Sequence, residues 1–97
     1  MKALEDAAIQ RRLAALPQWR YECGALRRDL QFGDFAAAFA FMVRVAAVAQ
    51  EQDHHPDWRN VYRHVSIALT THDAGGVTER DFVLAAAIDT VAKCELP

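Results

Sequence analysis

The spacing of apolar residues predicts a helix near the amino-terminal end of the chain. In residues 3–16, Ile9, Leu13 and Leu16 recur at positions i, i+4 and i+7, which lie on one face of a helix, and the opposite side is charged. Pro17 follows directly and marks the end of the pattern, because proline removes a backbone donor. We therefore expect a helix over residues 3–16.

Alternation of apolar and polar positions then predicts a hairpin. Trp19, Tyr21 and Cys23 alternate with polar residues, Gly24 interrupts the pattern, and apolar residues alternate again through residues 26–32. Two short alternating runs separated by a glycine are typical of adjacent antiparallel strands joined by a tight turn.

A nearly uninterrupted apolar run predicts a long central helix. Residues 35–49 contain a single charged side chain, Arg44, and the preceding Asp34 is a suitable N-cap. The run is shorter than the roughly 20 residues that span a bilayer, so we expect no membrane segment. A helix that is apolar on most sides must be covered on more than one side, and we therefore expect a homodimer or homotetramer.

Pro56 indicates where the long helix ends and a second pair of strands begins. It disfavours helical geometry at the residue before it, so the helix should end near Asp53. Residues 58–62 and 64–71 then have the pattern of two further strands. One face of the second of these strands would carry Val65, Ile67, Leu69 and Thr71.

A capping pattern predicts the last helix. Thr78 and Asp81 have the T-x-x-D spacing, which opens a helix that we expect to reach about Lys93. The apolar stripe of this helix would consist of Leu84, Ile88 and Val91.

These elements predict an α+β fold with the order α-β-β-α-β-β-α. Strands that come in adjacent pairs form antiparallel hairpins, and the expected architecture is a four-stranded antiparallel sheet with three helices on one face. A chain of 97 residues supports a single core, so we expect one domain over residues 1–97. The formal charge of -2, without a cluster of Lys and Arg, argues against a nucleic-acid partner.

The amino-terminal residues and the cysteines favour a cytoplasmic protein. Glu5 and Asp6 stand where a secretory signal would need an apolar stretch. Cys23 and Cys94 lie far apart without a second pair, so we expect packing or surface thiols and no disulfide.

Three of the four histidines lie where this topology would create a pocket. His54 and His55 follow the long helix, and His72 would end the fourth strand just before a Gly-Gly loop. Asp81 shares a helical face with apolar residues, so its side chain should point toward the sheet.

Each of these residues also has a structural alternative. Either His54 or His55 could stabilise the carboxyl end of the long helix through its dipole. His72 could be a surface residue at a strand end, and Asp81 could act solely in a capping box. Trp58 could be a core or rim aromatic, or it could form a wall that stacks on a flat ligand.

Proton transfer suits this set of residues better than metal binding or nucleophilic catalysis does. The spaced patterns H-x-x-x-H and C-x-x-C, which commonly bind zinc, do not occur in the chain. Neither cysteine falls beside a histidine in the sequence. Imidazole titrates near pH ~6.5, so a neutral and a protonated ring can coexist and provide a base and an acid. We expect no metal.

Four stretches of the chain resemble the pterin-4a-carbinolamine dehydratases: FGDFAAAFAFMVRVA at 32–46, HHPDW at 54–58, NVY at 60–62 and TTHDAGGVTERD at 70–81. The likeness extends from about Leu16 to Val91. It implies the α-β-β-α-β-β-α fold and an enzyme, a hydro-lyase without metal or organic cofactor. The substrate would be 4a-hydroxytetrahydrobiopterin, which loses water to give quinonoid dihydropterin, a step that regenerates the cofactor of aromatic amino acid hydroxylases.

The resemblance also assigns roles to individual residues. One of His54 and His55 would donate a proton to the leaving oxygen, His72 would act at the other edge of the ring, and Asp81 would orient His72 or another imidazole. The catalytic residues would thus be His54, His55, His72 and Asp81. The pterin, with Trp58 as an aromatic wall, would contact Asp53, His54, His55, Thr70, Thr71, His72 and Asp73.

Two further expectations accompany the resemblance. Many relatives carry Glu where this chain has Gln50, so a carboxylate role at that position is absent or is taken by Glu51 or Asp53. The family also includes members that act as dimerisation or assembly partners, which makes a non-catalytic partner protein the alternative function.

Overall fold

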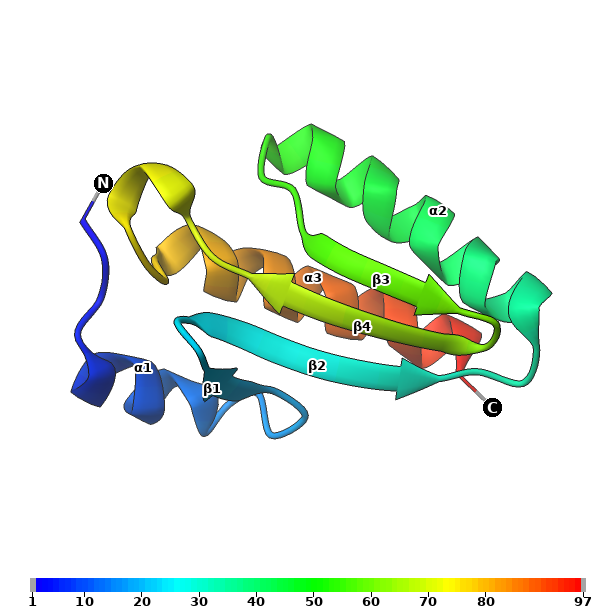
Figure 1. The fold of residues 1–97 in the computed structure, drawn as a ribbon, viewed down its shortest axis with the longest axis horizontal. Helices are drawn as coiled ribbons and strands as arrows, with labels where there is room; N and C mark the ends of the chain where they lie inside the picture. Colours follow the sequence, from blue (N-terminus) through cyan, green and yellow to red (C-terminus); the bar gives the residue numbers. More distant parts are fainter. Residues whose placement is uncertain (1, 97) are drawn as a thin grey trace.

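The helices and strands follow the predicted order. The structure is a computed structural model that describes residues 2–96, and Figure 1 shows its elements. They are α1 (Asp6–Leu13), β1 (Arg20–Glu22), β2 (Ala25–Gln31), α2 (Phe35–Gln52), β3 (Asp57–Val61), β4 (His64–Leu69), the 3-10 helix η1 (His72–Ala74) and α3 (Glu79–Glu95).

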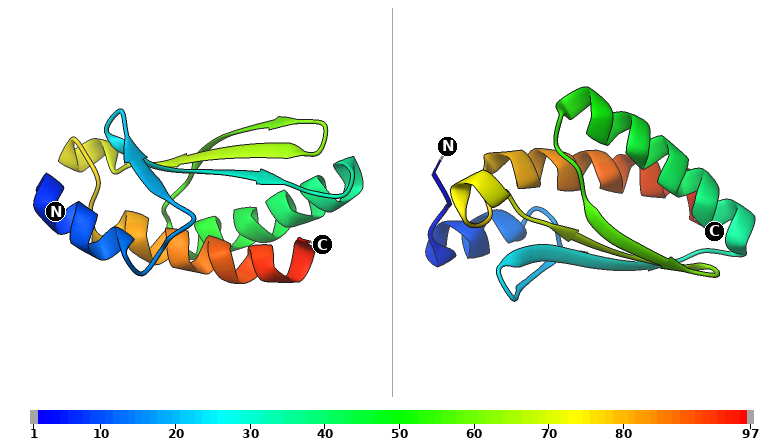
Figure 2. Two further views of the ribbon diagram at one scale, coloured as in Figure 1. Left: turned by 90° about the horizontal axis from the view of Figure 1, so that it is seen from below. Right: turned by 45° about the horizontal axis from the view of Figure 1, so that its top comes forward.

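The four strands form one antiparallel sheet in the order β1-β2-β4-β3. At its centre, Ile67 of β4 lies between Arg28 of β2 and Trp58 of β3. The turn from β1 to β2 passes through Cys23 and Gly24, both with positive φ, as a tight hairpin turn requires. Figure 2 shows all three helices on the same side of the sheet, so the predicted α+β architecture is confirmed.

The core lies between this sheet and the helices. The predicted face of β4 is buried through Val65, Ile67 and Leu69, and the predicted stripe of α3 is buried through Leu84 and Ile88. Burial of each such side chain contributes about 1.5–3 kcal/mol. The alternation along the fourth strand and the helical spacing of the last helix therefore located the core correctly.

The central helix α2 has one buried and one open face. Asp34 caps its first turn by accepting a hydrogen bond from the backbone N–H of Ala37 at 2.8 Å, as predicted. On the outer side, Phe35, Phe39 and Val43 are 47%, 52% and 54% exposed and follow one another at i, i+4 and i+8. None of the helices within residues 2–96 has the length and apolar character needed to cross a membrane.

The first helix is shorter than its sequence pattern predicts. Its first expected turn is extended, because the backbone N–H of Leu4 donates to the carbonyl of Val77 at 2.8 Å and holds this segment beside the loop before α3. Beyond Leu13, residues 14–16 continue in tighter turns with i to i−3 hydrogen bonds before Pro17.

The fourth strand is also shorter than predicted, which changes the position of His72. Strand β4 ends at Leu69, and Thr71 instead forms an isolated bridge with Gly76. This bridge closes a loop in which His72 begins η1, so His72 does not end a strand.

The thiols of Cys23 and Cys94 are free and exposed.

Candidate active site

The turn after α2 sends two adjacent histidines in different directions. Asp53 adopts the left-handed conformation with φ 50° and ψ 43°. The backbone N–H of Asp53 donates to the carbonyl of Gln50 at 3.2 Å, and that of His54 donates to the carbonyl of Ala49 at 3.1 Å. These two bonds close the helix end in the manner of a Schellman motif. His54 is consequently directed inward and is 8% exposed, whereas His55 is exposed.

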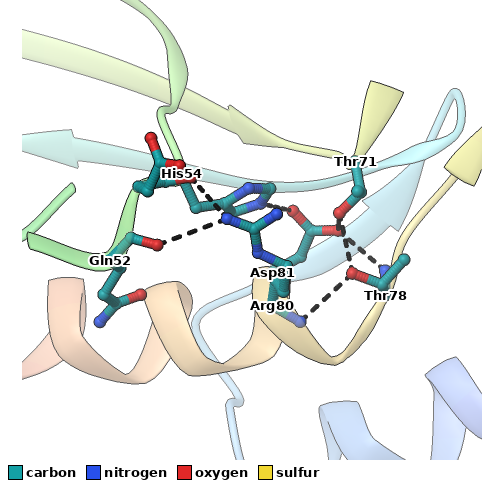
Figure 3. A network of polar contacts seen from close by, with 7 residues as sticks. Gln52, His54, Thr71, Thr78, Arg80 and Asp81 are labelled. Atoms are coloured by element: carbon teal, nitrogen blue, oxygen red, sulfur yellow. Dashed lines mark hydrogen bonds and ion pairs between the residues drawn. The ribbon is translucent and has the colours of Figure 1, made fainter. Parts of the chain in front are cut away.

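His54 is held by a fully buried carboxylate at the start of α3. Its Nε2 lies 2.5 Å from Oδ1 of Asp81, which is 0% exposed. The second oxygen, Oδ2, accepts the backbone N–H of Thr78 at 2.8 Å, which completes the predicted capping box. Asp81 therefore combines both roles considered from the sequence, and the imidazole that it contacts is His54 (Figure 3).

Two threonines determine the direction of the hydrogen bonds around Asp81. The hydroxyl of Thr71 donates to Oδ2 of Asp81 at 2.9 Å, so its oxygen must accept the hydroxyl proton of Thr78 across 2.8 Å. The oxygen of Thr78 also accepts the backbone N–H of Arg80 at 3.2 Å. The hydroxyl of Thr71 and the backbone N–H of Thr78 both donate to Asp81, which accepts through its two oxygens, so Nε2 of His54 is assigned as a third donor to Asp81 and Nδ1 as the nitrogen without a proton.

A cavity of about 240 Å³ lies beside this network. His55 and His72 are exposed at the cavity, while His54 reaches it from the buried side. Nε2 of His55 lies 3.2 Å from the side-chain oxygen of Gln50. Gln50 is the residue whose place is taken by Glu in many relatives. The cavity is lined by Asp53, His54, His55, Thr70, Thr71, His72, Asp73 and Arg80.

Arg80 is a lining residue that the sequence analysis missed. Its guanidinium donates to the backbone carbonyl of Asp53 at 2.5 Å and to that of Gln52 at 3.4 Å, so it caps the carboxyl end of α2. A cation in the first turn of a helix faces the positive end of the helix dipole, which is unfavourable. That conflict at the start of α3 was the available signal that Arg80 has a partner on another element.

The structure therefore brings together seven of the eight residues expected to contact a ligand. The exception is Trp58, which packs against the core and borders a separate hollow of about 220 Å³ over the sheet. Asp81 lies beneath the lining and reaches the cavity through His54. Within residues 2–96, no three His, Cys, Asp or Glu side chains are grouped closely enough to hold a metal ion.

The chemistry available in this cavity is proton transfer. Three imidazoles line it, and one of them is oriented by a buried carboxylate, an arrangement that suits a general acid or base. The cysteines do not line it.

The chain is similar to several known proteins. The sequence model of the family described as pterin 4 alpha carbinolamine dehydratase matches residues 2–91. A protein of Rhodospirillum rubrum named "Putative pterin-4-alpha-carbinolamine dehydratase" is 52% identical over 90 residues, which cover 91% of this chain and 94% of the relative. A protein of the same name from Burkholderia multivorans is 57% identical over 83 residues, covering 84% of this chain and 81% of the relative.

Solved structures show the same fold. The crystal structure of a transcriptional coactivator/pterin dehydratase from Brucella melitensis has a TM-score of 0.90 and 36% identity, covering 94% of this chain and 99% of that one. A pterin dehydratase-like protein described as a RuBisCO assembly factor in the alpha-carboxysome has a TM-score of 0.68 and 27% identity, covering 77% of this chain and 89% of that one. Because the family model matches nearly the whole length of the chain, the chain belongs to the pterin 4 alpha carbinolamine dehydratase family.

Proposed function

We propose that the protein catalyses the dehydration of 4a-hydroxytetrahydrobiopterin to quinonoid dihydropterin by acid–base catalysis. Membership of the family supports this reaction. The observation that carries the proposal is the meeting of His54, His55 and His72 at one cavity, with His54 bonded to the buried Asp81.

The reaction requires one proton to be given and one to be taken. An imidazolium donates a proton to the 4a hydroxyl, which leaves as water with the electrons of the C4a–O bond. N5 supplies the electrons of the new C4a=N5 double bond and loses its proton to a neutral imidazole. The protein therefore ends with the same number of protons as it began with, and no redox partner takes part.

We assign the base to His54. A base becomes positively charged when it accepts the N5 proton, and the carboxylate of Asp81 at 2.5 Å stabilises that charge in a dry environment. The acid would then be His55 or His72, since both are exposed and can regain a proton from solvent. Asp53, Thr70 and Asp73 would offer polar contacts to the edges of the pterin ring.

The test is the rate of carbinolamine dehydration over the spontaneous reaction. We expect His55→Ala and His72→Ala each to lower this rate by about a hundred-fold or more with the fold retained. His64→Ala is the matched control, because His64 is exposed on β4 and does not line the cavity. Wild-type protein that gives no acceleration, or His72→Ala that matches the control, would contradict the proposal.

A second candidate function is that of an assembly partner. The observation that favours it is the open apolar stripe of α2, formed by Phe35, Phe39 and Val43. Such a stripe is either closed by further copies of the chain, as a homodimer or homotetramer, or is available to another protein.

Light scattering after size exclusion separates these two outcomes. We expect wild-type protein to form a homo-oligomer and Phe39→Glu to shift it toward the monomer, while Gln10→Glu on the exposed side of α1 leaves its size unchanged. A wild-type protein that stays monomeric at all concentrations would contradict self-association and favour the partner function.

A further inference from the structure

The face of β2 that packs toward the helices carries a charge. Leu26 and Leu30 are buried on this face, and Arg28 between them is 9% exposed. Its guanidinium donates to Oδ1 of Asp89 at 2.5 Å, and the same oxygen accepts the indole N–H of Trp19 at 2.8 Å. Apolar replacement of a buried ion pair is often neutral or stabilising, so stability alone does not account for this pair.

The pair has unused capacity for hydrogen bonds. A guanidinium has five N–H donors, and within residues 2–96 the side chain of Arg28 makes one hydrogen bond, to Asp89. No side-chain nitrogen or oxygen that is sealed from solvent in this part of the chain lacks a partner. Nε and Nη2 of Arg28, which have no such partner, are therefore accessible from solvent.

That space is a cavity of about 470 Å³ between the α1–β1 connection and α3. It shares no lining residue with the cavity lined by His54, His55 and His72, and its volume falls in the range of about 300–1,000 Å³ typical of small-molecule sites. Arg28 and Asp89 line it together with Lys93, and its apolar walls include Leu16, Pro17 and Leu96.

The charges and walls of this cavity define what would fit. Arg28 and Lys93 are positive and Asp89 is negative, so the lining carries one positive charge in excess. A guanidinium binds carboxylates with charge-assisted and often bidentate hydrogen bonds. We propose that the cavity is a second ligand site, which takes a small carboxylate with its carboxyl group on Arg28 and its apolar body against Leu16 and Leu96.

The first experiment compares a carboxylate with its neutral counterpart. 3-Phenylpropanoate and 3-phenylpropanamide are titrated into the full chain by calorimetry, and Trp19 fluorescence is followed in Trp58→Phe protein, where Trp19 is the sole indole. We expect one site, at least about ten-fold tighter binding of the carboxylate, and a change in Trp19 emission, because its indole contacts Asp89. Equal affinities, or no binding by folded protein, would overturn the proposal.

Variants then locate the site. We expect Arg28→Met to weaken carboxylate binding by about ten-fold or more and Lys93→Met by less, since Lys93 is exposed. Ala15 is an exposed lining residue, and Ala15→Phe introduces a ring at the cavity without altering Arg28 or Asp89, so this variant tests the site if Arg28→Met fails to fold. His72→Ala should bind the carboxylate normally. Binding that is lost in His72→Ala, or retained in Ala15→Phe, would place the ligand elsewhere and refute the proposal.

Discussion

Two carboxylates of α3 lie about two helical turns apart and form very different sites. Asp81 is fully buried, and its two oxygens accept hydrogen bonds from His54, Thr71 and the backbone of Thr78. The side chain of Asp89 is 20% exposed, and one of its oxygens accepts both Arg28 and Trp19.

The comparison shows that burial and the number of satisfied hydrogen bonds determine what a carboxylate can do in a site. A saturated network holds its members in one geometry, which would suit the proton-transfer role that we propose for His54. A pair with unused donors at the wall of a cavity keeps polar capacity for a ligand. The same helix therefore carries a fully buried carboxylate with both oxygens hydrogen-bonded in its first turn and a partly exposed ion pair about two turns later.

The largest expected effect comes from the same substitution at both carboxylates. Asp81→Asn should lower the free energy of unfolding by about 3–5 kcal/mol, because it leaves buried donors facing an amide and removes the charge beside His54. Asp89→Asn should cost about 1–3 kcal/mol, since that side chain is partly solvated. Urea denaturation of both variants measures the two values. Equal losses would remove the distinction between the sites.

A smaller change sharpens the comparison on the side of Asp81. Thr71→Val keeps the shape of the side chain and removes one donor to Asp81, so we expect a loss of about 1–3 kcal/mol and a dehydration rate lowered by about ten-fold. Ser66→Ala on the exposed face of β4 is the control and should change stability by less than about 0.5 kcal/mol. A Thr71→Val protein with wild-type rate would show that His54 does not need the full network.

Substitution of Arg80 tests whether the turn that carries His54 and His55 must be held in place for activity. Arg80→Met removes the cap on the carbonyl of Asp53, and we expect a loss of about 1–2 kcal/mol with a larger change in KM than in kcat. Arg80→Lys should restore part of both. Steady-state kinetics and denaturation measure the effects, and an unchanged KM would limit Arg80 to a structural role.

The smallest effect concerns a third acidic residue of α3, which is paired at the surface. Arg12 hydrogen-bonds Glu79 and lowers the pKa of its carboxyl below the ordinary 4.5. A lowered pKa in the folded state stabilises the protein above the unfolded-state pKa, and this contribution is lost as the pH falls through the folded-state pKa. Glu79→Gln should therefore lower the melting temperature slightly at pH 7 and by less at pH 3. An equal shift at both pH values would contradict the pairing.

Short-range patterns in the sequence were sufficient to predict most of the helices and strands. Asp34 and Thr78 are short-range caps, and the alternation along β4 reports its buried face directly. Strand β4 ends at Leu69, earlier than predicted, beside the Thr71–Gly76 bridge. Helix α1 begins later than predicted because the backbone of Leu4 bonds to that of Val77. Those are contacts between separate segments, which periodicity does not report.

The sequence by itself determined the element order, the core faces and the family, and it indicated that His54, His55 and His72 would lie near one another, as they do at the cavity. The tertiary structure decided that His54 and not His55 meets Asp81, that Arg80 joins the cavity, and that Trp58 lies apart from it. It also formed the Arg28–Asp89 pair from residues 61 positions apart. The physical reason is that periodicity and capping act within a few residues, whereas the direction of a buried side chain is set by whichever distant groups satisfy its hydrogen bonds.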